Sequence, residues 1–136
     1  LLVGSEMCIR DSEFIYSLYP HIGNVTEGGT IEAANQLNLP AQVVSGVFTD
    51  WRKLVEVSSD CVQIDAVKKA EEEDCLIVRL HECRGGRRKV TLTSQFDVKR
   101  IVPCNLLEHD SGEAVEGSKV SFEVTPFMIK TFKLYL

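Results

Sequence analysis

The amino-acid sequence predicts a mainly β protein, an antiparallel β-sandwich of the immunoglobulin-like type with one short helix near the N-terminus. Apolar and polar residues alternate in runs such as Leu76–His81 and Val120–Thr125. Short turn signals, rich in glycine, proline or acidic residues, separate these runs. Short strands at this spacing are typical of antiparallel sandwiches.

Residues 1–12, LLVGSEMCIRDS, show neither sustained alternation nor helical spacing, and they resemble translated sequencing-adapter sequence. No basic segment precedes their apolar start, so they do not indicate a secretory signal. We therefore interpret residues 1–12 as foreign to the protein and exclude them from the fold. Residues 14–19 follow, and both of their alternating faces are largely apolar, which predicts a strand covered on both sides.

One segment has helical character. Thr26 is expected to cap a short helix over residues 27–36, whose apolar stripe includes Ile31 and Ala34. The acidic residues 71–74 predict a hairpin turn, Gly85-Gly86 predicts the next hairpin, and residues 108–119 are rich in turn formers. The β-rich runs predict strands at residues 43–48, 54–57, 62–70, 75–83, 90–93, 96–102, 120–125 and 128–136.

Charge and cysteine content narrow the classes of function. The net charge of −5 argues against a nucleic-acid partner, which would need a basic surface. No apolar stretch reaches the length that crosses a bilayer, so no membrane partner is expected. The five cysteines are an odd number without a C-x2-C pair, which indicates neither a disulfide framework nor a zinc site. Reduced, buried thiols predict a reducing compartment, the cytoplasm.

The sequence contains no motif of a complete catalytic or metal site. G-x-S-x-G, H-E-x-x-H and Walker-type glycine loops are missing. His21 is the one candidate substrate-binding residue, because it lies where a predicted strand ends and a loop begins. Its imidazole either lines a ligand cleft or bonds a nearby carbonyl and fixes the turn. The basic run Arg84–Lys89 either binds an anionic partner or forms the solvated tip of a hairpin.

Six stretches of this sequence together resemble the C-terminal region of glycoside hydrolase family 38 α-mannosidases. They occur in the order of the family, they cover essentially all of residues 13–136, and the variant they resemble is the bacterial and cytosolic type. The stretches are EFIYSLYPH at 13–21, EAANQLNLP at 32–40, VQIDAVKKAEE at 62–72, LIVRL at 76–80, NLLE at 105–108 and PFMIKTFKL at 126–134.

The resemblance implies that the intact enzyme hydrolyses terminal α-linked mannose with retention of configuration. It also implies that the aspartate nucleophile, the acid/base carboxylate and a catalytic zinc lie in an N-terminal domain outside this chain. We therefore expect no catalytic residue, no metal ligand and no cofactor here, and a chain that is inactive alone. Residues 13–42 are expected to end an upstream sandwich, and residues 43–136 to form a small terminal one. The expected partners are the upstream catalytic and sandwich domains and, in the intact enzyme, the mannoside substrate.

Two alternatives are a free-standing carbohydrate-binding sandwich and a protein-interaction sandwich. The first requires an exposed aromatic platform, whereas Trp51 and the aromatic residues of the strands are expected to be mostly buried. The second would use the basic run Arg84–Lys89 and predicts salt-sensitive binding to an acidic partner.

Overall fold

The computed structural model describes residues 15–39, 41–47 and 53–136. The chain divides into two compact units, Leu1–Gly46 and Val47–Leu136, and each unit is described by itself. The predictions for residues 1–12, Phe14, Phe48 and Trp51 fall outside the described residues.

The helix of the first unit, α1 (Thr30–Asn38), begins later than the predicted residue 27. Asn24 Oδ1 accepts hydrogen bonds from the backbone N–H groups of Thr26 (2.9 Å) and Glu27 (3.0 Å), which forms a turn where the helix was expected to start. Gly29 occupies the N-cap with a φ of 69°, in the left-handed region that suits glycine. The prediction of Thr26 as the cap is therefore wrong.

The strands predicted at 14–19 and 43–48 are also wrong in their described parts, residues 15–19 and 43–47, which have no strand conformation. A strand needs a neighbouring backbone to satisfy its N–H and C=O groups. Within the described residues no strand pairs with these segments. The apolar side chains of the first segment are consequently exposed, with exposed fractions of 77% for Ile15, 85% for Tyr16 and 92% for Leu18.

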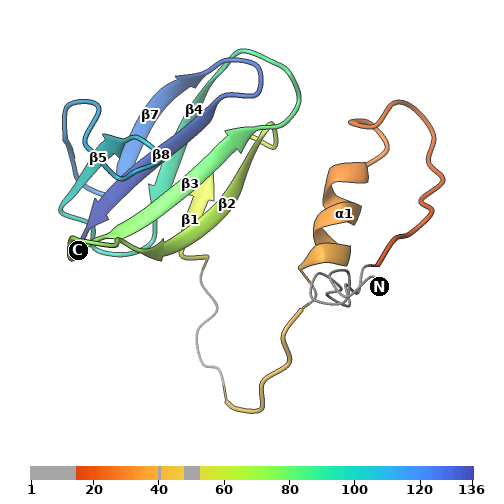
Figure 1. The fold of residues 1–136 in the computed structure, drawn as a ribbon, viewed down its shortest axis with the longest axis horizontal. Helices are drawn as coiled ribbons and strands as arrows, with labels where there is room; N and C mark the ends of the chain where they lie inside the picture. The colour runs from red at the N-terminus through yellow and green to blue at the C-terminus, as the bar shows by residue number, and fades with distance from the viewer. Residues whose placement is uncertain (1–14, 40, 48–52) are drawn as a thin grey trace, which may run out of the picture. The chain divides into compact units, whose positions relative to one another are not determined.

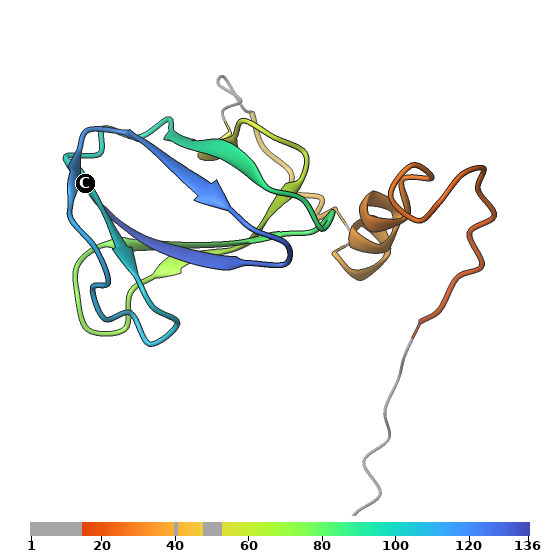
Figure 2. The ribbon, with the colours of Figure 1, turned by 90° about the horizontal axis from the view of Figure 1, so that it is seen from above.

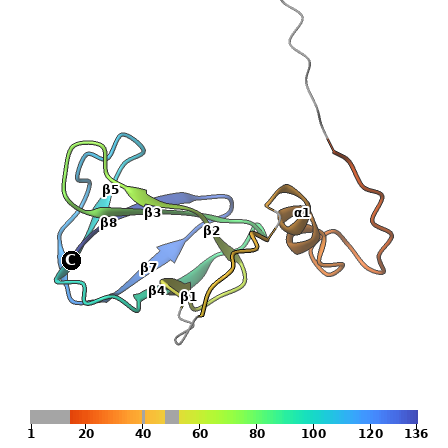
Figure 3. The same cartoon turned by 90° about the horizontal axis from the view of Figure 1, so that it is seen from below.

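The second unit is the predicted antiparallel sandwich. Figure 1 shows its strands, and Figure 2 and Figure 3 show its two layers edge-on. One sheet has the order β1-β4-β7 and the other the order β2-β3-β8-β5-β6, with every pair antiparallel. The strands are β1 (Val55–Val57), β2 (Val62–Lys69), β3 (Leu76–Glu82), β4 (Arg88–Ser94), β5 (Arg100–Cys104), β6 (Val115–Glu116), β7 (Lys119–Val124) and β8 (Ile129–Tyr135).

The core lies between the sheets and follows the predicted alternation. Successive side chains of a strand point to opposite faces, so every second residue of β3 points inward. Val78 pairs with Phe132 of β8, and Leu80 packs in the same cluster, fully buried. Burying side chains of this size contributes about 1.5 to 3 kcal/mol each. The remaining fully buried apolar residues of this cluster are Cys61, Val90, Leu92, Ile101, Val124 and Leu134.

One connection between strands and one strand start differ from the prediction. The hairpin predicted at residues 71–74 joins β2 and β3 and is confirmed. The hairpin predicted at Gly85-Gly86 is wrong, because β3 and β4 lie in different sheets and the segment between them crosses the sandwich. The strand predicted from residue 96 begins only at Arg100, since the N–H of Val98 bonds the carbonyl of Phe96 (2.9 Å) in a turn.

The outer face of the five-stranded sheet is buried as well. Ile77, Val102, Thr131 and Lys133 alternate with the core residues of their strands, yet each is less than 6% exposed. The β2–β3 turn and the loop after β5 lie over this face, and the backbone N–H of Glu71 in the first bonds a side-chain oxygen of Glu108 in the second (2.9 Å). A hollow opens at this covered face.

Candidate functional site

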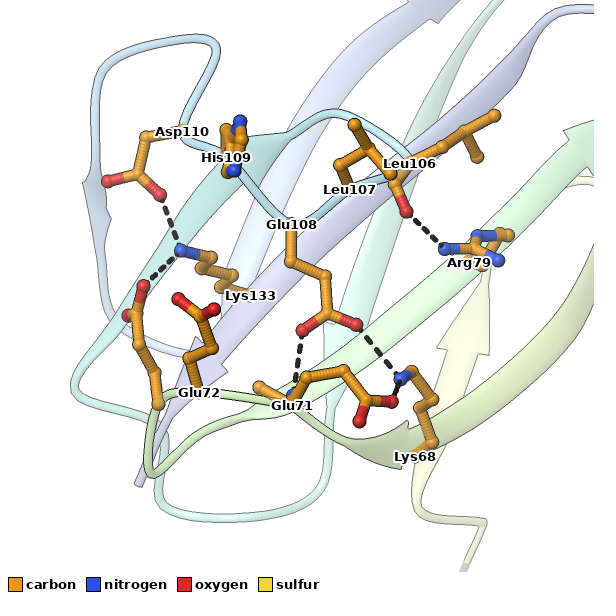
Figure 4. A pocket seen from close by; sticks show the side chains of 12 residues that line it. Lys68, Glu71, Glu72, Arg79, Leu106, Leu107, Glu108, His109, Asp110 and Lys133 are labelled. Atoms are coloured by element: carbon orange, nitrogen blue, oxygen red, sulfur yellow. Dashed lines mark hydrogen bonds and ion pairs between the residues drawn. The ribbon is translucent and has the colours of Figure 1, made fainter.

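The hollow has a volume of about 680 Å³ and lies on the outer face of the five-stranded sheet, between the β2–β3 turn and the loop after β5 (Figure 4). Its floor comes from β3 and β8, and its rim carries the exposed apolar side chains of Leu106 and Leu107. We call it the loop hollow; it is lined by Lys68, Ala70, Glu71, Glu72, Glu73, Arg79, Leu106, Leu107, Glu108, His109, Asp110 and Lys133.

The loop after β5 has a fixed backbone. Asn105 Oδ1 accepts hydrogen bonds from the N–H groups of Leu107 (2.9 Å) and His109 (3.0 Å), and the N–H of Asn105 bonds the carbonyl of His109 (2.9 Å). Glu108 adopts a φ of 66°, which an L-residue with a side chain seldom takes. This turn aims the Glu108 carboxylate at Lys68, which lies 2.9 Å away on β2.

Lys133 is the charged residue at the floor of the loop hollow. Its side chain is 3% exposed, and its ammonium contacts Glu73 and lies 2.8 Å from an oxygen of Asp110. Burial would lower the pKa of Lys133, but the hydrogen bonds to Asp110 and Glu73 outweigh it and raise that pKa above the usual 10.5. Lys133 therefore stays charged and joins the two loops.

The neighbouring groups complete the same network. The hydroxyl of Tyr135 donates to Glu73, and this bond together with burial raises the pKa of Tyr135 to about 12. The hydrogen bond from Lys133, followed by that from Tyr135, lowers the pKa of Glu73. The pKa of Glu108 is lowered by the backbone N–H of Glu71 and then by Lys68. The lowered pKa values of Glu73 and Glu108 favour their charged carboxylates, and the raised pKa of Tyr135 keeps its hydroxyl protonated as a donor, so these contacts persist at neutral pH.

The loop hollow is crossed by contacts that hold its own side chains in place. Its three cations are engaged, since Lys68 and Lys133 meet carboxylates and Arg79 donates to the carbonyl of Leu106 (3.1 Å). The resolved pKa shifts of its carboxyl groups, those of Glu73 and Glu108, are both downward. His109 lines the hollow, while His81 lies apart on β3 and its Nδ1 bonds Asp65 (2.7 Å).

His21 lies in the first unit, not in the loop hollow. It is exposed, and its ring faces that of Tyr19 with centroids 6.0 Å apart. The ring also lies against Gly28, where an added Cβ would come within 2.2 Å of Nδ1 of His21. Glycine at position 28 is therefore what admits the imidazole. A role for His21 in substrate binding stays a prediction.

Residues 83–87 form the crossing between the two sheets, and the basic run Arg84–Lys89 covers most of this crossing and the first two residues of β4. Glu82, at the end of β3, is fully buried, and its carboxylate accepts hydrogen bonds from the N–H groups of Arg84 (3.0 Å), Gly85 (2.8 Å) and Gly86 (3.0 Å). The N–H of Phe127, in the segment between β7 and β8, donates a fourth bond (2.9 Å). We call this arrangement the Glu82 clamp.

Sequence reasoning missed the Glu82 clamp, although a signal for it exists. Glu82 has the same parity as Val78 and Leu80, so the alternation of β3 places a carboxylate on the core side. Two glycines follow within four residues, which supplies donors and a tight path around the carboxylate. A buried acid is tolerated only when hydrogen bonds replace its water.

The described residues contain neither a candidate metal site nor a candidate membrane-spanning helix. Among residues 15–39, 41–47 and 53–136, no group of three or more His, Cys, Asp or Glu side chains is placed to hold a metal ion. The zinc that the family resemblance implies therefore finds no ligand set in this part of the chain. Within the same residues, no helix has the length and apolar character to cross a membrane.

Comparison with known proteins assigns the fold to a family. Residues 61–132, more than half of the chain, match the family described as "Glycosyl hydrolases family 38 C-terminal beta sandwich domain". Alpha-mannosidase G of Dictyostelium discoideum is 29% identical over 89% of this chain and 12% of its own length. Alpha-mannosidase 2C1 of Mus musculus is 30% identical over 91% of this chain and 13% of its own length.

The yeast Alpha-mannosidase is 22% identical over 90% of this chain and 14% of its own length. The chain thus spans 12 to 14% of the length of these relatives. The matched residues include the Glu82 clamp and most of the strands described above. The chain belongs to glycosyl hydrolase family 38 and carries its C-terminal β-sandwich domain.

Proposed function

We propose that this chain is the C-terminal structural region of an α-mannosidase, which supports a catalytic domain located elsewhere in the parent enzyme and is inactive alone. The observation that carries the proposal is the match of residues 61–132 to the C-terminal sandwich of the family, combined with the small share of each relative that the chain spans. In the intact enzyme, the family resemblance implies zinc-dependent hydrolysis of terminal α-linked mannose with retention of configuration.

Two features of the described residues support a structural role. The ion pairs and the hydrogen bond of the loop hollow join loops of the sandwich to one another and to its strands, which stabilises the domain. In the first unit, Ile15, Tyr16 and Leu18 are exposed and no residue of α1 is buried, as expected of a segment whose partner is a further domain. Separately, the buried free thiols of Cys61, Cys75 and Cys104 support a location of the parent enzyme in the reducing cytoplasm.

The proposal is tested by comparing this chain with the full-length parent enzyme. Both are assayed on an aryl α-mannoside in the presence of zinc, with a chelator control. We expect turnover by the full-length enzyme that the chelator abolishes, and none by the 136-residue chain. Chelator-sensitive turnover by the chain would overturn the assignment of the active site to another domain. A titration of the chain with mannosides checks the carbohydrate-binding alternative, which saturable binding at millimolar or lower concentration would favour.

A further inference from the structure

An aromatic side chain is displayed at one corner of the sandwich. Phe127 is 71% exposed and adopts a φ of 58°, although it is neither glycine nor asparagine. Its ring lies over the crossing between β3 and β4, where a Cβ added to Gly85 would lie 3.4 Å from Cζ of Phe127. A bulky residue in the left-handed region is unfavourable by itself, so the surrounding structure must hold it there.

The Glu82 clamp supplies that constraint. The carboxylate of Glu82 binds the N–H of Phe127 (2.9 Å) and the N–H groups of three residues of the crossing. The carbonyl of Thr125 accepts a bond from Met128 (3.1 Å), which closes the turn around Phe127. The ring is therefore presented to solvent by a backbone fixed at both ends, and little conformational entropy remains to be lost when it is buried in an interface.

A basic hollow lies next to Thr125, two residues before Phe127. Arg87, Arg88 and Lys89 are all exposed, and they line a hollow of about 220 Å³ together with Glu123, Val124 and Thr125. Arg88 stands opposite Val124 in the β4–β7 pair, and Lys89 stands opposite Glu123. The corner thus presents three cations against one carboxylate, beside an apolar anchor. We call Gly85, Arg87, Arg88, Lys89 and Phe127 the basic corner.

We propose that the basic corner docks onto an acidic surface, with an apolar socket for Phe127, in the part of the parent α-mannosidase that lies outside this chain. The inference rests on the proposed function, in which this chain is part of a longer enzyme. The chain spans only 12 to 14% of the length of its relatives, and the remaining polypeptide of the parent enzyme is the partner always present at high effective concentration. Aromatic and arginine side chains are the residues that contribute most at protein interfaces.

The charge of the corner favours a protein over a sugar as the occupant. A neutral mannoside would stack on the ring but would leave the net positive charge of the corner uncompensated. An acidic protein surface uses both features, since its carboxylates pair with Arg87 and Arg88 while an apolar socket buries Phe127. The prediction of a protein-interaction surface at Arg84–Lys89 is in this way narrowed to an intramolecular contact with the parent enzyme.

The test is photo-crosslinking in the full-length parent enzyme. p-Benzoylphenylalanine replaces Phe127 and, as the matched control, Lys119, which is exposed at the opposite end of β7. After irradiation we expect a crosslink from position 127 to an upstream peptide rich in Asp or Glu, within one polypeptide. The double substitution R87E/R88E is expected to reduce its yield at least about fivefold, while K119E leaves it unchanged.

Four results would overturn the docking. They are a yield at position 127 no higher than at position 119, a crosslink to a second copy, an upstream peptide without acidic residues, and protection by methyl α-mannoside, which would make the corner a sugar site. Turnover of an aryl α-mannoside by the same preparations reports on the proposed function separately. An active enzyme without the crosslink rejects the docking alone, whereas an inactive wild-type enzyme rejects the proposed function.

Discussion

Replacing Glu82 with glutamine tests whether one buried carboxylate holds the crossing between the two sheets. Glutamine has nearly the same shape but keeps only one oxygen. In the wild type, one oxygen of Glu82 accepts from Arg84 and Gly86 and the other from Gly85 and Phe127. In Glu82→Gln, two of these N–H groups face an NH₂ group that cannot accept a hydrogen bond.

The magnitude follows from the structure in two ways. Two buried N–H groups without acceptors cost about 1 to 3 kcal/mol each, or about 2 to 6 kcal/mol together. The second route uses the pKa of Glu82, which burial would raise but which the four backbone donors lower from 4.5 to about 2. That difference corresponds to about 3 kcal/mol of stability at neutral pH. We therefore expect Glu82→Gln to lower the free energy of unfolding by about 3 kcal/mol.

The pH dependence gives the sign. Because the pKa of Glu82 is lower in the folded state, its contribution to stability is fully present above about pH 4.5 and is lost as the pH falls toward 2. Urea unfolding of the chain, followed by circular dichroism at several pH values, measures both quantities. Glu82→Gln should remove the loss of stability that protonation of Glu82 causes at low pH. Glu123→Gln, an exposed control at the end of β7 that leads to Phe127, should leave that loss unchanged. A variant within about 0.5 kcal/mol of the wild type, or with an unchanged slope, would refute the role of the clamp.

The other predictions concern the loop hollow, the cysteines and Phe127. Lys133→Met leaves Glu73 and Asp110 without their common cation. Because both carboxylates are partly exposed, we expect the free energy of unfolding in urea to fall by about 1 to 2 kcal/mol, against no change for Lys119→Met at an exposed position. In a Cys8→Ser background, Cys83 should react with Ellman's reagent in the native chain, while buried Cys61, Cys75 and Cys104 react only on unfolding. Burial also raises the pKa of Cys75 and Cys104, which slows their reaction further. Equal reaction rates at all four thiols would contradict the fold. Phe127→Gly should be more stable than Phe127→Ala by about 1 kcal/mol, since only glycine takes a φ of 58° without strain, and the opposite order would contradict this backbone conformation.

The sandwich is predictable because its determinants are local. In β3 and β8, a period of two separates core residues from the others, and the acidic run between β2 and β3 is a turn signal that can be seen in the local sequence. The strand predicted at residues 14–19 is wrong in its described part, residues 15–19, because a strand also needs a partner that local sequence does not specify. Its apolar residues satisfy the pattern of a strand, but a pattern does not supply the neighbouring backbone that a ladder requires.

The loop hollow could not be predicted from local sequence patterns. Lys133 alternates with Phe132 and Leu134, so its position predicts a solvated side chain on the outer face. It is buried because the β2–β3 turn and the loop after β5, which are far apart in the sequence, cover that face and bring Glu73 and Asp110 to it. Only the tertiary arrangement places an acid from each loop beside one lysine.

Glu82 and Lys133 use charge differently at the two ends of the five-stranded sheet, and this difference bears on docking. At the end of the loop hollow, cations and carboxylates compensate each other within the domain. At the crossing, backbone amides saturate Glu82, so its negative charge is not used to pair with Arg87 or Arg88. The same carboxylate fixes Phe127, which couples the stability of the crossing to the presentation of the basic corner. Glu82→Gln in the full-length enzyme should consequently lower the crosslink yield at position 127, even in conditions where the sandwich remains folded. Glutamine offers one acceptor oxygen in place of two to the four N–H groups of the clamp, and one of these groups belongs to Phe127.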